Sequence, residues 1–334
     1  MDTDLPPDLQ AALDTLTEGV SRNALSQRAA AISQAYRSGG SSAGTIRSRD
    51  DGLAYAMARL PATFAAAAAA LAAVKQAVPD FMPQTLLDVG AGPGTASWAA
   101  MGYFTHLKEI HLADENPYLR ELALEFLASS GEPALRNAAY QQGAAQQLLP
   151  VAEKADLVTA SYFIGEIPAD QILSTAEALW SRAGDALLVI EPGTPAGFAR
   201  IRKVRSHLIG QGGHVICPCP HDAQCPMTGD DWCHFAQRLN RSRDHRQVKG
   251  AALSFEDEKF SYVALARNRS AVVAYDRVLA PPRVTKAQIT TKLCTAQGLV
   301  ADVASRRDRD AYKMRKSWRW GDAVSRAAAS PARQ

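Results

Sequence analysis

Residues 85–99 read TLLDVGAGPGTASWA, and this stretch decides the fold. An apolar run that contains Asp88 stops at Gly90, and Gly90, Gly92 and Gly94 alternate before small, helix-compatible residues begin. The pattern predicts a strand, a tight turn and a helix. Glycine adopts backbone conformations that other residues avoid, and without a Cβ it lets a ligand approach the main chain. We therefore expect the turn to bind a nucleoside-like ligand.

The spacing of these glycines indicates which nucleoside is bound. G-x-G-x-G differs from the G-x-G-x-x-G fingerprint of dinucleotide sites, which favours S-adenosylmethionine over a nicotinamide cofactor. Residues 109–114 read as the next strand, and an acid at its end can accept hydrogen bonds from a ribose diol. The predicted cofactor-binding residues are Asp88, Gly90, Gly92, Gly94 and Asp114.

Strands and helices continue to alternate downstream, which predicts a parallel, doubly wound α/β sheet. Residues 155–162 read as a buried strand and 186–191 as another, separated by a helix over 169–181. Glu166 follows the first of these strands, above the edge where such sheets bind ligands. It is the candidate catalytic or substrate-side residue.

The first 80 residues read as helices, because apolar residues recur at intervals of three and four. Residues 37–49 form a glycine-serine loop between two arginines, which we interpret as a mobile connector rather than a phosphate-binding loop. Pro61 interrupts an apolar pattern, so one helix should end and another begin near Leu60.

The composition, 47% hydrophobic and 21% charged over 334 residues, indicates a globular protein with a substantial core. The acidic start lacks the features of a secretory signal, and the longest apolar run, 64–74, is too short to span a bilayer. We therefore expect a cytoplasmic protein without a membrane partner. Its five cysteines should be reduced, so their clustering favours metal binding over disulfides.

Cysteines gather in one loop of the C-terminal half. The loop holds Cys217, Cys219, Cys225 and Cys233, and Cys294 follows downstream. The spacing matches neither a zinc ribbon nor a bacterial ferredoxin, and His221 and His234 could serve zinc as nitrogen ligands. Prolines and polar residues leave little apolar packing to bury unligated thiols. The loop therefore predicts a metal site of undecided type.

Charge is distributed unequally between the halves. Residues 1–200 hold 13 basic and 22 acidic residues, a net −9, whereas residues 201–334 hold 24 and 12, a net +12. Basic residues interleaved with aromatic ones suit the phosphates and unpaired bases of RNA. The candidate RNA-binding residues are Arg238, Arg241, Arg243, Arg246, Lys249, Arg315, Lys316, Trp318 and Arg319.

Four segments together resemble one protein family. DVGAGPGT, EPGTPAGF, CPCPHDAQCP…DWCHF and KSWRWGD are similar to the methyltransferase-like proteins of small-ribosomal-subunit assembly. This family is called Rsm-twenty-two in yeast mitochondria and methyltransferase-like protein seventeen in animals, and it has bacterial members, of which this chain looks like one. The resemblance implies a class I methyltransferase fold, association with small-subunit ribosomal RNA, and a 4Fe-4S cluster.

The resemblance also implies a ligand set for that cluster. The family's cysteine elements fall on Cys219, Cys225, Cys233 and Cys294, which leaves Cys217 spare. Thiolate ligation suits an iron–sulfur cluster or zinc, and from the residues alone Cys217 could replace Cys219. The resemblance therefore supplies the choice of 4Fe-4S, with zinc as the alternative.

Three functions remain open from the sequence. No Asn-Pro-Pro-Tyr element for base methylation and no pyrimidine nucleophile motif is found, so the chain is either an S-adenosylmethionine-dependent rRNA methyltransferase or a methyltransferase-like factor. The alternatives are a non-catalytic RNA-binding assembly factor with a structural metal site, and, more remotely, a small-molecule methyltransferase. We expect three regions: a helical one over 1–80, a Rossmann-like core over 81–213, and a cysteine-cluster and basic region over 214–334 that completes the sheet.

Overall fold

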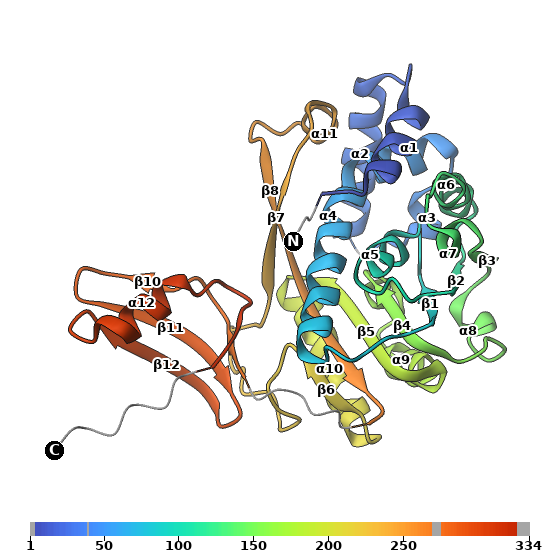
Figure 1. The fold of residues 1–334 in the computed structure, drawn as a ribbon. Helices are drawn as coiled ribbons and strands as arrows, with labels where there is room; N and C mark the ends of the chain where they lie inside the picture. Colours follow the sequence, from blue (N-terminus) through green and yellow to red (C-terminus); the bar gives the residue numbers. More distant parts are fainter. Residues whose placement is uncertain (1–3, 39, 269–274, 326–334) are drawn as a thin grey trace.

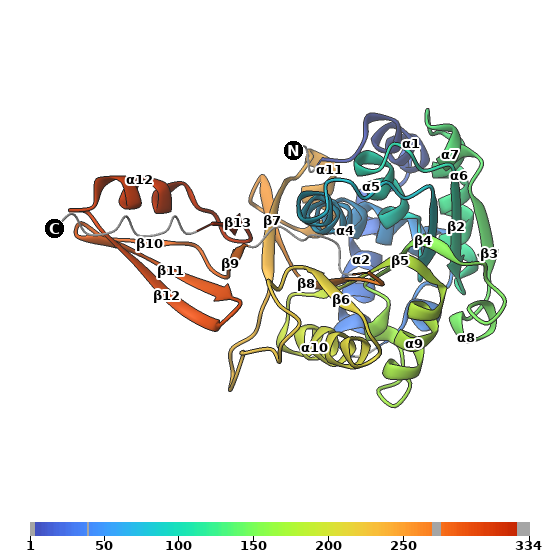
Figure 2. The same ribbon diagram turned by 60° about the horizontal axis from the view of Figure 1, so that its bottom comes forward.

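The computed structural model describes residues 4–38, 40–268 and 275–325. A large α/β body carries most of the chain, and a small module at the C-terminal end lies to one side of it (Figures 1 and 2). The helices of the N-terminal region are α1 (Pro7–Thr17), α2 (Arg22–Arg37), α3 (Ser42–Thr45) and α4 (Arg49–Ala77).

Helix α4 is one long helix at the centre of the body, where the sequence predicted two shorter ones. It runs unbroken through Pro61, so the predicted break near Leu60 is wrong. A proline inside a helix costs about 3 kcal/mol. Leu60 and Ala62, on either side of it, are fully buried, and packing of this kind outweighs that cost. Helix α4 is long and apolar enough to cross a bilayer, but 72% of its most apolar window is buried inside the protein.

Within the described residues the main sheet has eight strands. They are β1 (Thr85–Val89), β2 (Glu109–Asp114), β3 (Ala139–Gln142), β4 (Ala155–Ser161), β5 (Ala183–Pro192), β6 (His214–Cys217), β7 (Phe235–Asn240) and β8 (Phe255–Ala266). Their order is β3-β2-β1-β4-β5-β8-β6, with β7 paired to β8 outside this path. The pairs from β3 to β5 are parallel, but β8 runs antiparallel to both β5 and β6.

This strand order is that of the class I S-adenosylmethionine-dependent methyltransferases. The predicted α/β fold is therefore confirmed, and the prediction of a wholly parallel sheet is corrected at one strand. The connecting helices are α5 (Thr95–Tyr103), α6 (Pro117–Ala128), α7 (Pro133–Arg136), α8 (Ala145–Leu148), the 3-10 turn η1 (Ile164–Glu166), α9 (Ile172–Arg182) and α10 (Pro195–Gly210). They cover the faces of the sheet together with α4.

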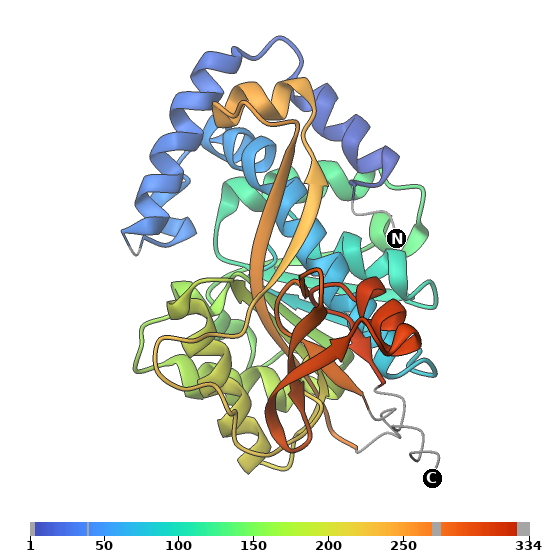
Figure 3. The same cartoon turned by 90° about the vertical axis from the view of Figure 1, so that its left-hand side faces the viewer.

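Strands β7 and β8 extend beyond the sheet as a long hairpin, which we name the arm (residues 235–260). Helix α11 (Arg243–Lys249) lies at its tip and packs on α2 and α4 (Figure 3). Strand β8 pairs with β7 over Phe255–Phe260 and with β5 over Phe260–Ala266, so one strand belongs to both the arm and the main sheet. The arm therefore links the N-terminal helices to the core.

The C-terminal module spans residues 275–325. It contains β9 (Asp276–Val278), β10 (Arg283–Val284), β11 (Gln288–Thr295), β12 (Gly298–Ser305), α12 (Arg309–Ser317) and β13 (Ala323–Val324). Its core consists of Val278, Leu293, Trp318 and Val324. The expected region 214–334 is thus divided, because β6, β7 and β8 complete the main sheet while the module forms a second sheet.

Candidate cofactor cavity and cysteine cavity

The glycine turn lies between β1 and α5. Gly90, Gly92 and Gly94 all adopt positive φ angles, of 66°, 52° and 82°. A Cβ on Gly90 would come within 2.4 Å of the ring of Phe163, so the turn requires glycine for space as well as for conformation. Gly90 and Gly92 line one cavity, whereas Gly94 is the N-cap of α5 and is not a lining residue.

Asp88 braces this turn from beneath. Its Oδ2 accepts hydrogen bonds from the backbone N–H (3.1 Å) and hydroxyl (2.8 Å) of Ser97, and its Oδ1 accepts one from the hydroxyl of Thr159 at 2.8 Å. The side chain is fully buried, and burial raises its pKa to about 6 despite these bonds. Asp88 thus ties β1 to α5 and β4.

Asp114 ends β2 beside the turn. Its Oδ2 accepts a hydrogen bond from the Gly92 N–H at 2.9 Å, and its Oδ1 accepts one from the Asn116 N–H at 2.8 Å. Burial raises the pKa of this carboxyl as well. Each carboxylate oxygen retains a second lone pair, so Asp114 can still accept hydrogen bonds from a ribose diol.

The cavity at the turn has a volume of about 250 Å³. Its lining residues include the acids Asp88, Asp114, Glu115 and Glu166 and, in the described part of the chain, no lysine, arginine or histidine. Such a wall attracts a cationic ligand and repels a phosphate. It therefore suits a sulfonium nucleoside better than a nucleotide.

The N-terminal region closes one side of this cavity. The backbone N–H and the hydroxyl of Ser42 both donate to Glu166 Oε2, at 2.7 and 2.8 Å. The amide of Asn116 donates to the carbonyl oxygens of Ser42 (3.1 Å) and Ile46 (3.0 Å). These four hydrogen bonds help to hold the segment interpreted as a mobile connector, and Ser42 of this segment lines the cavity. Neither Ser42 nor Asn116 was selected from the sequence.

Glu166, the catalytic candidate, is the anchor of this segment. Burial raises its pKa to about 7, although hydrogen bonds from Ser42 oppose the change. One of its two oxygens is occupied by Ser42, and the hydroxyl of Tyr36 also bonds the carboxyl. Glu166 lines the cavity, but its contacts are those of a residue that holds the N-terminal segment.

A second cavity brings four cysteines together. It lies between α10, the cysteine loop, β8 and the C-terminal module, and it is lined by Cys219, Cys225, Cys233 and Cys294. Cys217 is not among the lining residues and belongs to the main hydrophobic core. The structure therefore juxtaposes the four thiols that the family resemblance implies.

The thiols of this cavity lie in a buried environment that favours their neutral form. Burial raises the pKa of Cys219 and Cys233, and that of Cys294 to about 12. Among the described residues no group of three histidine, cysteine or carboxylate side chains is arranged to hold a metal ion. The donor chemistry fits a thiolate-bound metal, whereas no coordination geometry is defined.

Two buried arginines flank the four cysteines. Arg205 is 3% exposed and donates to the carbonyl oxygens of His221 and Ala223, while its Nε has no hydrogen-bond partner. Arg277 is 2% exposed and donates to the carbonyl oxygens of Pro218 and Gly321. No carboxylate forms an ion pair with either arginine in the described part of the chain. A buried cation without a counter-ion destabilises the folded state. Anionic thiolates in this cavity would supply the missing counter-charge.

The two candidate histidine ligands differ in position. His221 Nε2 lies 3.7 Å from Cys294 Sγ, and its Nδ1 has no partner among the described atoms. The ring of His234 stacks on Trp232, at 5.0 Å between centroids, and meets Trp320 edge-on. Only His221 is thus placed beside a cavity thiol.

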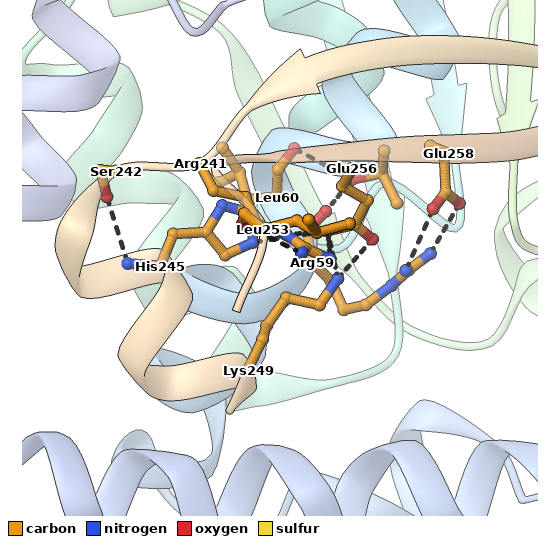
Figure 4. A network of polar contacts seen from close by, with 10 residues as sticks. Arg59, Leu60, Arg241, Ser242, His245, Lys249, Leu253, Glu256 and Glu258 are labelled. Carbon is orange, nitrogen blue, oxygen red and sulfur yellow. Dashed lines mark hydrogen bonds and ion pairs between the residues drawn. The ribbon is translucent and has the colours of Figure 1, made fainter. Parts of the chain in front are cut away.

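The predicted RNA-binding cations of the arm are largely engaged within the protein (Figure 4). Arg241 lies 2.9 Å and Lys249 2.7 Å from Glu256, and all three side chains are less than 20% exposed. Arg238 pairs with Asp257 at the surface. Arg243 remains exposed and Arg246 is half-buried. The arm thus presents less positive charge than its sequence indicates.

Of the predicted RNA-binding residues of the C-terminal module, two are engaged within the protein and two are exposed. Trp318 is 8% exposed in the module core and is not accessible to an RNA base, so its predicted stacking role is corrected. Arg315 lies over the Trp318 ring and pairs with Asp302 at 2.9 Å. Lys316 and Arg319 are exposed.

Comparison with known proteins decides the family. The family described as "Mitochondrial small ribosomal subunit Rsm22" matches residues 49–325. This chain belongs to that family. The human mitochondrial ribosome assembly protein METTL17 is 30% identical over 291 residues, which are 81% of this chain and 61% of METTL17. The Rsm22-cox11 tandem protein 2 of Schizosaccharomyces pombe, also mitochondrial, is 26% identical over 217 residues, 55% of this chain and 27% of that protein.

This chain therefore spans less than two thirds of either relative. Solved structures with a similar fold include an O-methyltransferase family protein from Burkholderia thailandensis (TM-score 0.42, 12% identity, 68% of this chain and 62% of that one). Another is the magnesium protoporphyrin IX methyltransferase of Synechocystis with bound SAM (TM-score 0.41, 12% identity, 80% and 100%). These likenesses concern the fold alone.

Proposed function

We propose that this protein is an S-adenosylmethionine-binding, methyltransferase-like factor that acts on the small ribosomal subunit and contacts its RNA. The observation that carries the proposal is the cavity of the glycine turn. Its acidic lining, with no lysine, arginine or histidine among the described residues, suits the sulfonium and ammonium groups of S-adenosylmethionine. Membership of the Rsm22 family and the ribosome-assembly role named for human METTL17 support the ribosomal part.

The contacts of Glu166 favour an assembly factor over an efficient enzyme. Ser42 occupies one carboxylate oxygen, and the N-terminal segment closes the side of the cavity next to Glu166. A volume of about 250 Å³ is slightly below the usual range of about 300–1,000 Å³ for small-molecule sites, so little room remains for a nucleobase beside the cofactor. Catalysis would require this segment to move.

Binding of the cofactor is tested by calorimetry with S-adenosylmethionine. Gly92→Arg places a large cationic side chain in the cavity and should abolish binding, whereas Asp114→Ala should weaken it by about 1–3 kcal/mol. The matched control is Gly102→Ala in α5, where an added Cβ meets nothing within 4 Å. Unchanged binding in both cavity variants would remove the assignment. Methyl transfer to small-subunit particles then separates an enzyme from an assembly factor.

We further propose that Cys219, Cys225, Cys233 and Cys294 hold a 4Fe-4S cluster, with zinc as the alternative. Four thiols in one cavity and the two unpaired buried arginines support an anionic metal–thiolate centre of either type. Such a centre would join the cysteine loop to β11, and its loading would be coupled to folding of the module. The metal would therefore have a structural role.

Metal analysis and visible absorption of anaerobically purified protein test the centre. Each single Cys→Ser variant in the ligand set should lose metal, and Cys217→Ser is the control that should keep it. Stoichiometric zinc without iron would overturn the cluster type. Full metal content in Cys294→Ser would overturn the ligand set.

A further inference from the structure

The strongest unassigned surface is the outer side of α12. The turn before the helix, the helix itself and the residue after Trp318 carry six exposed basic side chains: Arg306, Arg307, Arg309, Lys313, Lys316 and Arg319. Within the described ranges none of the six forms an ion pair with an acidic side chain. This arrangement contrasts with five other cations of the basic half that have acidic partners, namely Arg238, Arg241, Lys249, Lys292 and Arg315.

The helix aligns three of these charges. Residues of an α-helix are 100° apart, so Arg309, Lys313 and Lys316 lie on one side, and the 1.5 Å rise separates them by about 5–6 Å along the axis. The opposite side carries Met314 and leads to Trp318, which pack on the module core. Helix α12 lies along the second sheet (Figure 2), so its basic side faces away from that sheet.

Acidic residues of the module do not cancel this charge. Residues 275–325 contain 11 basic and 5 acidic residues, a net +6. Asp302 pairs with Arg315, and Asp308 caps α12 by accepting from the Ala311 N–H. Asp322 accepts from the backbone N–H of Arg319. Asp310 is exposed in the first turn of α12 but forms no ion pair with the six cations among the described residues, so this side keeps a net positive field.

The chemistry of the basic side of α12 indicates which kind of partner it can bind. A helix that lies on a membrane needs an exposed apolar side opposite its charges, but the apolar side of α12 is buried against the sheet. Trp318 is also buried, and the half-buried Tyr312 donates its hydroxyl to the carbonyl oxygen of Thr285, so the described residues of α12 offer bases no fully exposed aromatic ring. A row of cations without an apolar or stacking element suits a sequence-independent contact with phosphates.

We propose that Arg306, Arg309, Lys313 and Lys316 form a docking surface for an RNA phosphate backbone, and that this surface, rather than the arm, carries most of the RNA contact. The inference deepens the proposed ribosomal function and rests on it. It assigns the module a direct role in attachment, with the cysteine cavity beside it as its link to the core. The contact is electrostatic and independent of base sequence.

The test uses the full-length, metal-loaded protein and a fluorescein-labelled single-stranded RNA of mixed sequence. Affinity is measured against salt for the wild type, for R309Q/K313Q/K316Q, and for the matched arm variant R238Q/R243Q/R246Q. Each single-strand phosphate contact contributes about −0.7 to the log–log slope, so the α12 variant should flatten the slope by about 2 and weaken binding at least about tenfold. The arm variant should leave the slope nearly unchanged.

Other outcomes separate the two proposals. If the arm variant flattens the slope and the α12 variant does not, the surface is misassigned while RNA binding stands. If the wild type binds no RNA, the RNA part of the proposed function fails first. Equal or tighter binding of poly-glutamate that depends on the same three residues would assign the surface to an acidic protein instead. Circular dichroism of both triple variants checks that they are folded.

Discussion

The arm and α12 carry similar basic runs in the sequence but use them differently in the fold. Cations of the arm meet acids at short range, as Arg241 and Lys249 do at Glu256. Those of α12 project from a helix whose one ion pair among the described residues joins Arg315 to Asp302 of β12. Net charge along a segment is therefore a poor guide to the charge that a partner meets.

The acids that neutralise the arm come from its own strand. Residues 256–258 of β8 are Glu-Asp-Glu, and successive side chains of a strand point to opposite faces. Glu256 and Glu258 thus face the N-terminal helices, where Glu258 pairs with Arg59 of α4 at 3.0 Å (Figure 4). Asp257 points the other way and meets Arg238. Arg238, Arg241 and Lys249 of the arm therefore form ion pairs within the protein.

Glu256→Gln gives the largest effect expected from this difference. It removes the counter-charge from Arg241 and Lys249, which are both mostly buried. Breaking a buried ion pair costs about 3–5 kcal/mol, and the partial solvent access here reduces the expected loss to about 2–3 kcal/mol. Urea unfolding followed by circular dichroism measures it.

Asp257→Asn is the matched control on the same strand. Its pair with Arg238 lies at the surface, where ion pairs contribute little, so no measurable change is expected. Equal losses in the two variants would show that the arm is not stabilised by burial of its charges.

His245 provides an intermediate effect through pH. Burial and the charge of nearby Lys249 lower its pKa to about 4, and its Nε2 lies 3.9 Å from Glu256. Between pH 4 and the ordinary value near 6.5 the unfolded chain binds more protons than the folded one, so stability falls as pH falls. The loss from this residue should reach about 2 kcal/mol by about pH 5.

This effect is measured as a difference between the wild type and His245→Gln. The comparison is needed because Asp88 and Glu166, whose pKa values are raised, have the opposite effect. Their contribution to the stability of the fold decreases as the pH rises toward 6–7. The described module contains no histidine, so no such dependence should appear at α12. Parallel pH curves for wild type and variant would contradict the burial of His245 in the arm.

Much of the fold could be predicted from local patterns. The bounds of β2 and the glycine turn follow from an apolar run, an acid and alternating glycines, and the structure reproduces both. The antiparallel course of β8 could not be predicted, because it depends on pairing with β5 across some 70 residues of sequence. The helix break predicted at Pro61 was wrong for a related reason. Whether α4 continues through the proline depends on the burial of the helix in the fold, which local propensity does not reveal.

The sites show the same limit. Cysteine clustering and family resemblance led to the four thiols of one cavity, but Arg205 and Arg277 were missed because a buried arginine looks like any other in a basic region. One signal was available: Arg205 follows Ile201 by four residues, in phase with the apolar face of α10. Ser42 and Asn116 gave no such signal, because their role depends on contacts between distant segments.

The smallest effect is expected for the stability of R309Q/K313Q/K316Q, the variant of α12. Exposed side chains without ionic partners contribute little to folding, so the free energy of unfolding should stay within about 0.5 kcal/mol of the wild type. Arg241→Gln removes a single charge in the arm and should cost more, because it leaves Glu256 with one buried partner fewer. Urea unfolding of the two variants side by side measures both. If three charges lost from α12 destabilise the protein more than one lost from the arm, the cations of α12 have structural partners and their availability to RNA is refuted.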